Sequence, residues 1–203
     1  GYSEMKRILG AIHDYLPYCH RVASYASIRS ISRYSLEELS ALHDAGLRLL
    51  YIGFETGRDD VLRSMRKGHT VDEAVEQARK LNEARLPFNT VIMYGIAGEG
   101  ESLKNALSTA GMINRFKTGK VITMNLVVFY GTELDGMVKR GEFTPPGAKE
   151  RLLEIRTLLE SLTPEDRMVF DTTHPTNIIK IFGTLPEDRQ SLLAEVVRHL
   201  DKA

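Results

Sequence analysis

A carboxylate stands at the end of an apolar stretch in residues 51–57 (YIGFETG). Side chains alternate between the two faces of a strand, so Glu55 is expected on the same face as Tyr51 and Gly53, with open space over the glycine. A carboxylate beside such a space is suited to accept two hydrogen bonds from a diol such as a ribose. The alternative is a surface role, as a helix cap or in an ion pair with Arg58, and the residues alone favour that alternative.

A cation follows twelve residues later, in 67–69 (KGH), at the predicted end of a short helix. The ammonium of Lys67 could fold back to hold a carboxylate. A lysine in this place is more commonly a solvated charge that complements the helix dipole. The sequence leaves both interpretations open.

Glycines recur in 95–100 (GIAGEG), between a predicted strand and a helix. Their spacing differs from that of the phosphate-binding loops, and Glu99 and Glu101 would repel a phosphate. The loop therefore predicts either close approach of the backbone to a less anionic group, such as a purine ring, or a simple tight turn.

Polar residues near two other strand ends are candidates for a substrate region. Asn125 interrupts the apolar run 121–130. A buried amide needs hydrogen-bond partners, so Asn125 is expected either to line a barrel lumen or to be satisfied by neighbouring backbone. His174 and Asn177, in 174–177 (HPTN), could reach toward the strand ends. The six histidines lack a metal-binding spacing, and no metal site is predicted.

Composition limits the function further. The chain has 203 residues, 42% of them hydrophobic, and 27 basic residues balance 27 acidic ones, so no overall field attracts nucleic acid or an anionic membrane. The apolar runs are shorter than the ~20 residues of a membrane span. The only cysteine, Cys19, excludes an internal disulfide. These features predict a cytoplasmic protein without a membrane partner or a strong nucleic-acid signal.

Apolar strand-like runs alternate with helical periodicity, which predicts an α/β fold with parallel strands and crossover helices. Strands are expected at 21–28, 48–54, 88–94 and 121–130, with a weaker one at 168–170. Helices are expected after the caps Ser35 and Thr70, from Ser102 to residue 113, and at 147–162 and 186–200. Both an open doubly wound sheet and part of a (β/α) barrel fit, and in both the ligands meet the carboxyl ends of the strands.

Four segments, in their order and spacing, resemble the radical S-adenosylmethionine (SAM) superfamily, and most closely its Elp3-like and coproporphyrinogen-dehydrogenase-like branch: 51–57 (YIGFETG), 60–62 (DVL), 67–70 (KGHT) and 93–98 (MYGIAG). The similarity continues through 127–134 (VVFYGTEL), where relatives have a Pro-Gly-Thr-Pro-Leu turn. The segments 141–143 (GEF) and 174–186 resemble the tail of an uncharacterised bacterial group of these proteins. Nearly the whole chain from residue 21 onward is covered.

The resemblance implies a partial parallel (β/α)6 barrel, TIM-like, with SAM lying across the carboxyl ends of the strands. Glu55 would hold the ribose hydroxyls and Lys67 the methionine carboxylate. Residues that would flank the adenine, by apolar contact and backbone hydrogen bonds, are Met93, Tyr94, Gly95, Phe129, Tyr130 and Gly131. Residues that would face the methionyl and substrate region are Ser24, Tyr25, Ser27, Asn125, His174 and Asn177.

The chain departs from the family at the iron–sulfur cluster. Relatives hold a [4Fe–4S] cluster with a Cys-x-x-x-Cys-x-x-Cys loop, whereas this chain has Cys19 alone, and the glycine-rich motif after the second strand is also missing. A chain truncated at its N-terminus is therefore expected, with a barrel portion at 1–146 and a helical extension packed on it at 147–203. Losing strands would expose the edge at 21–28, which invites pairing with another chain and hence a dimer.

The resemblance implies that the parent protein is an enzyme in which a reduced [4Fe–4S] cluster cleaves SAM to a 5′-deoxyadenosyl radical. The chain itself is expected to be inactive, because one cysteine cannot supply three thiolates. The substrate stays open. The alternative is a non-catalytic α/β domain that binds a nucleotide or a partner through 95–100.

Overall fold

The computed structural model describes residues 1–203 and contains one mixed sheet of six strands, in the order β1-β2-β3-β4-β5-β6. The strands are β1 (Val22–Ser27), β2 (Leu47–Glu55), β3 (Phe88–Tyr94), β4 (Lys120–Asn125), β5 (Met168–Asp171) and β6 (Phe182–Leu185). Strands β1 to β5 pair in parallel, as expected, whereas β6 pairs antiparallel to β5 and was not anticipated. The sheet is therefore mostly, not wholly, parallel.

Nine helices accompany the sheet: α1 (Tyr2–Tyr15), α2 (Ile28–Ile31), α3 (Leu36–Asp44), α4 (Asp59–Ser64), α5 (Val71–Glu83), α6 (Ser102–Ile113), α7 (Glu133–Lys139), α8 (Ala148–Ser161) and α9 (Arg189–Leu200). The predicted caps Ser35 and Thr70 each accept a hydrogen bond from a backbone N–H three residues on, and each closes a capping box. Helices α1, α2 and α7 were not predicted. No helix is both long and apolar enough to cross a membrane.

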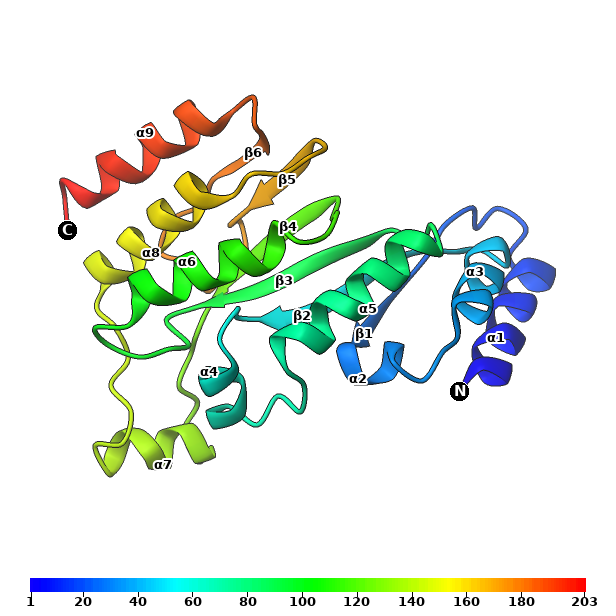
Figure 1. The fold of residues 1–203 in the computed structure, drawn as a ribbon, viewed down its shortest axis with the longest axis horizontal. Helices are drawn as coiled ribbons and strands as arrows, with labels where there is room; N and C mark the ends of the chain where they lie inside the picture. Colours follow the sequence, from blue (N-terminus) through cyan, green and yellow to red (C-terminus); the bar gives the residue numbers. More distant parts are fainter.

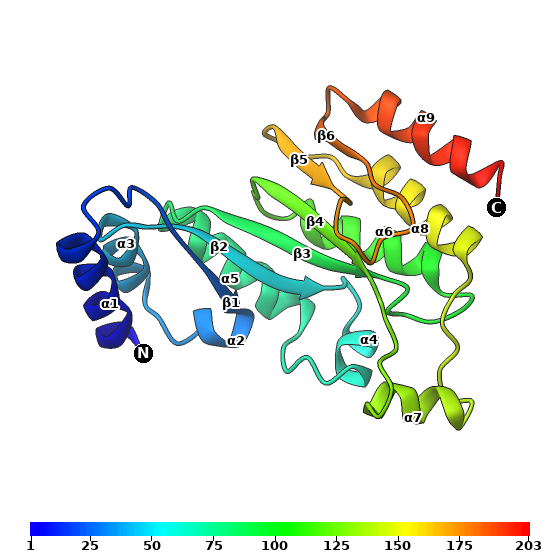
Figure 2. The ribbon, with the colours of Figure 1, turned by 180° about the vertical axis from the view of Figure 1, so that it is seen from behind.

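The helices α5, α6 and α8 lie on one face of the sheet (Figure 1). Seen from behind, the strands β1 to β4 lie in front of them, with their other face uncovered (Figure 2). Register places Leu50 beside Phe88 and Ile92 beside Thr123, and these buried side chains belong to the helix-covered face. Burial of this apolar layer is the main favourable term in the fold, at roughly 25 cal/mol per Å².

The other face of the sheet, here called the open face, carries Tyr25 on β1 and Tyr51 on β2. Their rings pack at a centroid distance of 5.4 Å, and Tyr25 remains 86% exposed. Because β1 is the first strand in the order, only β2 pairs with it. Since helices form the outer ring of a (β/α) barrel, the open face corresponds to the side that such a barrel would enclose.

The strand expected at 121–130 ends early, at Asn125. The neighbouring strand β3 ends at Tyr94, whose carbonyl accepts the Leu126 N–H at 2.9 Å. Beyond this bond the chain has no neighbour with which to continue a ladder. Residues 126–130 therefore leave the sheet despite their strand-like composition.

Candidate functional site

The carboxylate of Glu55 lies at the carboxyl end of β2, next to an irregularity in the sheet. The register with β3 shifts between Gly53 and Glu55, and Glu55 takes the left-handed φ of +67°. This conformation is strained for a residue with a side chain, and such bulges re-aim side chains near functional sites. A Cβ atom on Gly53 would lie 2.7 Å from Glu55 Oε1, so the glycine leaves the space that the carboxylate uses.

Lys67 meets this carboxylate from the segment after α4. Its Nζ lies 3.2 Å from Glu55 Oε1, and the two side chains are only 30% and 16% exposed. The predicted alternative partner, Arg58, instead binds Asp60 and Glu101, each at 2.5 Å. The hydrogen bonds from Arg58 lower the pKa of Asp60 to about 2. Glu55 and Lys67 are therefore paired with each other at the strand end.

The end of β3 differs from its predicted role. Met93 is half-buried on the open face, but Tyr94 is 1% exposed on the helix-covered face, and burial raises its pKa well above the ordinary value. The Gly95 N–H, expected to be available to an adenine, donates to Glu154 Oε2 at 2.9 Å. The predictions for the Tyr94 side chain and the Gly95 N–H are wrong, because strand alternation turns the first inward and α8 takes the second.

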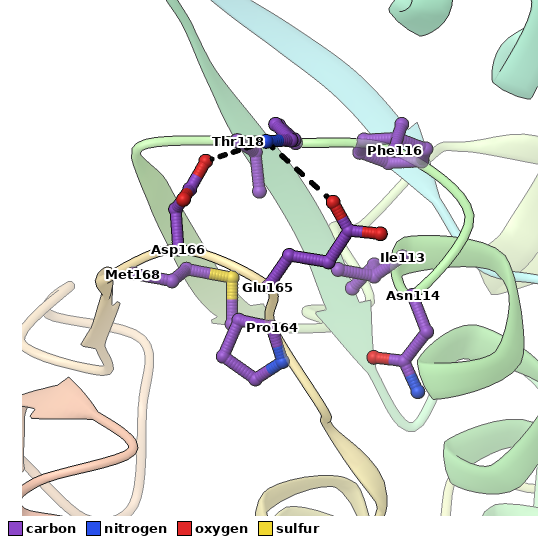
Figure 3. Close-up of a pocket in the computed structure, with 9 residues that line it drawn as sticks. Ile113, Asn114, Phe116, Thr118, Pro164, Glu165, Asp166 and Met168 are labelled. Carbon is purple, nitrogen blue, oxygen red and sulfur yellow. Dashed lines mark ion pairs between the residues drawn. The ribbon is translucent and has the colours of Figure 1, made fainter.

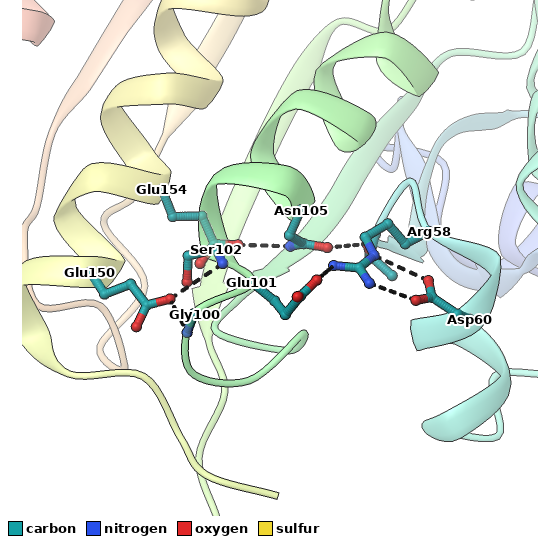
Figure 4. A network of polar contacts seen from close by, with 9 residues as sticks. Arg58, Asp60, Gly100, Glu101, Ser102, Asn105, Glu150 and Glu154 are labelled. Carbon is teal, nitrogen blue, oxygen red and sulfur yellow. Dashed lines mark hydrogen bonds and ion pairs between the residues drawn. The ribbon is translucent and has the colours of Figure 1, made fainter.

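A buried polar network joins the turns after β2 and β3 through α6 and α8 (Figure 4). Glu154 on α8 accepts the Asn105 side-chain amide at 2.7 Å, and Asn105 Oδ1 accepts the Thr56 hydroxyl at 2.5 Å. One turn away, Glu150 Oε1 accepts the Gly100 N–H at 2.8 Å. No pattern in the sequence predicted this network. Its only signal was an acidic residue, Glu154, within the apolar stretch of a helix.

Burial dominates the electrostatics of Glu154, which is 1% exposed. Loss of solvation raises its pKa to about 7, against the opposing effect of the hydrogen bonds from Asn105 and Gly95. Glu55 and Glu154 line one small cavity of about 10 Å³ together with Met93 and Asn105. The two residues thus border the same small space near the ends of β2 and β3.

The predicted substrate residues on β1 separate between the two faces. Register pairs Ser24 with the buried Leu50, so Ser24 belongs to the helix-covered face and its predicted place is wrong. Tyr25 lies on the open face. The Ser27 hydroxyl accepts the Ser30 N–H at 3.1 Å and caps α2.

Three other predicted residues gather beyond β4, around Thr176. Asn125 donates its side-chain amide to the Thr176 carbonyl at 2.9 Å, and His174 Nδ1 lies 2.8 Å from the Thr176 hydroxyl. The Asn177 amide donates to the Thr123 carbonyl at 2.6 Å. Since Asn125 pairs in register with Tyr94, it belongs to the helix-covered face and does not line the lumen. Its Oδ1 and that of Asn177 are buried without a partner.

The loop between β4 and α7 holds the remaining predicted residues. Phe129 and Tyr130 are 66% and 92% exposed, and Lys139 Nζ lies 4.7 Å from the centre of the Tyr130 ring. The Gly131 N–H donates to Asp135 Oδ2 at 2.9 Å. That donor is therefore already used by a side chain of α7.

Other cavities lie apart from these residues. A small one of about 20 Å³, between the segment after α6 and the segment before β5, is bordered by the ion pairs of Lys117 with Glu165 and Asp166 (Figure 3). Two open polar clefts of about 470 and 410 Å³ share Gly68, His69 and Glu73. None of these cavities is lined by Glu55, Lys67 or Met93.

The two groups that the resemblance implies fit these residues differently. A SAM molecule fits the strand ends, where Glu55 offers a carboxylate, Lys67 an ammonium and Met93 an apolar side chain, with Gly53 leaving room. A [4Fe–4S] cluster does not fit. Cys19 is single and exposed, and no group of three His, Cys, Asp or Glu side chains is placed to hold a metal.

Comparison with known sequences supports the resemblance. A profile of the Radical SAM superfamily matches residues 9–110, half of the chain. The tRNA uridine(34) acetyltransferase of Methanocaldococcus jannaschii is 26% identical over 130 residues, and that of Methanocaldococcus infernus is 24% identical over 132 residues. Each match covers 64% of this chain and 24% of the relative, so the chain spans about a quarter of the curated relatives' length.

Solved structures show the same fold. The Methanocaldococcus infernus Elp3 with an N-terminal deletion superposes with a TM-score of 0.64 at 19% identity, covering 90% of this chain and 42% of the other. Methylornithine synthase (PylB) gives a TM-score of 0.50 at 15% identity, covering 89% and 57%. The sheet is accordingly a part of a TIM-like barrel, as predicted. The matched profile places the chain in the radical SAM superfamily of enzymes.

Proposed function

We propose that this chain supplies the SAM-binding strand ends of a radical SAM enzyme. The observation that carries the proposal is the Glu55–Lys67 pair over Gly53 at the carboxyl end of β2. Glu55 accepts hydrogen bonds from the two ribose hydroxyls, and Lys67 binds the methionine carboxylate. Met93 contacts the adenine with its side chain on the open face. All of these residues lie inside the stretch that matches the superfamily profile.

The family match and the chemistry of the donors support this assignment together. A cis-diol needs a strong double acceptor, and an ionised carboxylate is one. In the absence of ligand, the pair of Glu55 with Lys67 partly neutralises both groups at 3.2 Å. When SAM binds, Lys67 exchanges this partner for the carboxylate of the ligand, and Glu55 turns its oxygens to the ribose.

The test is isothermal calorimetry of SAM with the chain. We expect Glu55→Ala to weaken binding at least tenfold, equivalent to about 1.4 kcal/mol. The control is Glu83→Ala, which removes an exposed acid at the end of α5 and should leave the affinity unchanged. Binding of a nucleoside triphosphate that is indifferent to Glu55 would instead support a non-catalytic nucleotide-binding domain.

In the whole enzyme, a reduced iron–sulfur cluster supplies the electron for reductive cleavage of SAM. The residues of this chain bind and orient SAM but do not hold that cluster, so the chain alone is inactive and the cluster ligands lie outside it. Anaerobic reconstitution with iron and sulfide tests this part. We expect well below one cluster per chain by absorbance and iron analysis, and a stoichiometric cluster would contradict it. The proposal places the enzyme in the cytoplasm.

A further inference from the structure

One buried carboxylate on α8 reaches both turns to which the proposed function assigns SAM. Glu154 Oε2 accepts the Gly95 N–H at 2.9 Å, at the end of β3. Glu154 Oε1 accepts the Asn105 amide at 2.7 Å, and Asn105 passes the contact on to the Thr56 hydroxyl at 2.5 Å. We call Gly95, Glu154, Asn105 and Thr56 the Glu154 network. Its three side chains are at most 3% exposed.

The turn after β2 needs such support. Glu55 has a positive φ, which costs a non-glycine residue about 1–3 kcal/mol and persists only where the surroundings enforce it. Hydrogen bonds with α6 hold the two residues that follow Glu55. Thr56 is held by Asn105, and the Gly57 N–H donates to the Thr109 hydroxyl at 3.0 Å. These bonds fix the backbone from which the Glu55 carboxylate projects.

The turn after β3 is held more directly. Gly95 has a φ of +73°, and its N–H has no acceptor within the sheet, because β3 ends at Tyr94. Glu154 supplies that acceptor. The bond fixes the backbone at Gly95, directly after the end of β3. It thereby fixes the position of Met93, whose side chain lies on the open face.

A carboxylate is a costly choice for this position. Burying an ionised group is unfavourable, and an apolar side chain in an otherwise apolar helix face would normally pack better. A carboxylate, however, offers a separate oxygen to each of two donors that come from different segments. The buried carboxylate therefore lowers the stability of the fold, but it fixes the positions of the turns after β2 and β3 relative to each other.

From these contacts we infer that Glu154 is a positioning residue that sets the distance between the Glu55 turn and the β3 end, and so governs the affinity for SAM. This inference rests on the proposed function. Glu154 does not touch SAM in this assignment. It acts through the Gly95 N–H on one side and through Asn105 and Thr56 on the other.

The experiment combines NMR-detected hydrogen exchange with calorimetry of SAM on the same samples. At about pH 8, above the pKa of Glu154, the carboxylate is ionised, and Glu154→Gln keeps the shape but replaces one acceptor with a donor that faces another donor. We expect faster exchange of the Gly95 and Gly57 amides and about tenfold weaker SAM binding. Thr56→Val breaks only one arm, so it should release Gly57 while leaving Gly95 protected, and should also weaken SAM. The control Glu160→Gln removes an exposed acid on the same helix, paired with Arg156, and should change neither readout.

The outcomes separate the inference from the proposed function. Unchanged exchange at Gly95 and Gly57 in Glu154→Gln, or unchanged SAM affinity while the wild type binds, overturns the inference alone. A wild type that does not bind SAM overturns the proposed function and, with it, this inference. If Glu154→Gln does not fold, Thr56→Val carries the test, and normal SAM affinity in that variant overturns the inference.

Discussion

Lys67 Nζ lies 3.2 Å from Glu55 Oε1, although α4 separates the two residues along the chain. The pair sits at the carboxyl end of β2, and both side chains are less than a third exposed. Partial burial reduces screening by solvent, so we place the contribution of this pair near the upper end of the range of about 0–1 kcal/mol that is typical of surface ion pairs.

Removing the cation tests this relationship. We expect Lys67→Met to lower the free energy of unfolding by about 1 kcal/mol or less, as for other partly exposed pairs, and to weaken SAM binding. Urea denaturation and calorimetry measure the two effects. Lys149→Met, which removes an exposed lysine in the first turn of α8, is the control. Unchanged SAM affinity in Lys67→Met would show that Lys67 is a solvated charge only.

The raised pKa of Glu154 makes stability depend on pH. The pKa of Glu154 is about 7 in the folded protein, against an ordinary value of 4.5. At a pH between these two values the folded protein keeps a proton on Glu154 that the unfolded chain releases. The contribution is complete below about pH 4.5 and is lost as the pH rises through about 7. The full difference is about 3 kcal/mol.

Urea denaturation at several pH values between about 5 and 8 measures this dependence. Glutamine does not titrate, so the wild type should lose about 3 kcal/mol relative to Glu154→Gln across this range. Taking the difference between the two proteins removes the contributions of the other carboxylates. Parallel profiles would mean that Glu154 titrates normally.

Gly57 is a position at which any side chain is excluded. A Cβ atom there would lie 2.2 Å from the Ser108 carbonyl oxygen in the backbone of α6. We expect Gly57→Ala to destabilise the protein by about 1–3 kcal/mol, by overpacking. Gly111→Ala on the exposed side of the same helix meets nothing within 4 Å and should stabilise by about 0.5–1 kcal/mol. Thermal unfolding compares the Tm of the two variants with that of the wild type. Equal changes in Tm for Gly57→Ala and Gly111→Ala would refute the packing argument.

The edge strand β1 provides a prediction about association. We propose that its unpaired side joins a second copy of the chain at high concentration, because an open strand edge offers free backbone groups. Light scattering across a dilution series should show a shift from dimer to monomer. Ala23→Lys, which places a charge on the exposed edge, should favour the monomer. A wild type that is monomeric at all concentrations would refute the proposal.

Local signals explain what the sequence could predict of the fold. The strand expected at 88–94 is observed as Phe88–Tyr94, and the helix after Thr70 begins at its capping box. Short strands such as β6, with four residues, carry no periodicity of their own and depend on a partner. The early end of β4 has the same cause, since only the neighbouring strand decides where pairing stops.

The candidate site was predicted in part. The sequence identified Glu55 and Lys67 as residues of interest, but not that they pair with each other. It assigned Tyr94 to the wrong face. The Glu154 network was invisible, because Glu154 lies 59 residues from Gly95 and 49 from Asn105, and only tertiary packing brings them together. Sequence patterns describe single elements, whereas this network depends on how four elements meet.

The position of α8 bears on how the protein can be shortened. Cutting the chain before Ala148 would spare every strand that carries Glu55 or Met93, yet it would strip the acceptors from the Gly95 and Gly100 amides. The segment after residue 147 is therefore no dispensable appendage. A trimmed version would keep the side chains at the strand ends but would lose the carboxylates that fix the turn after β3.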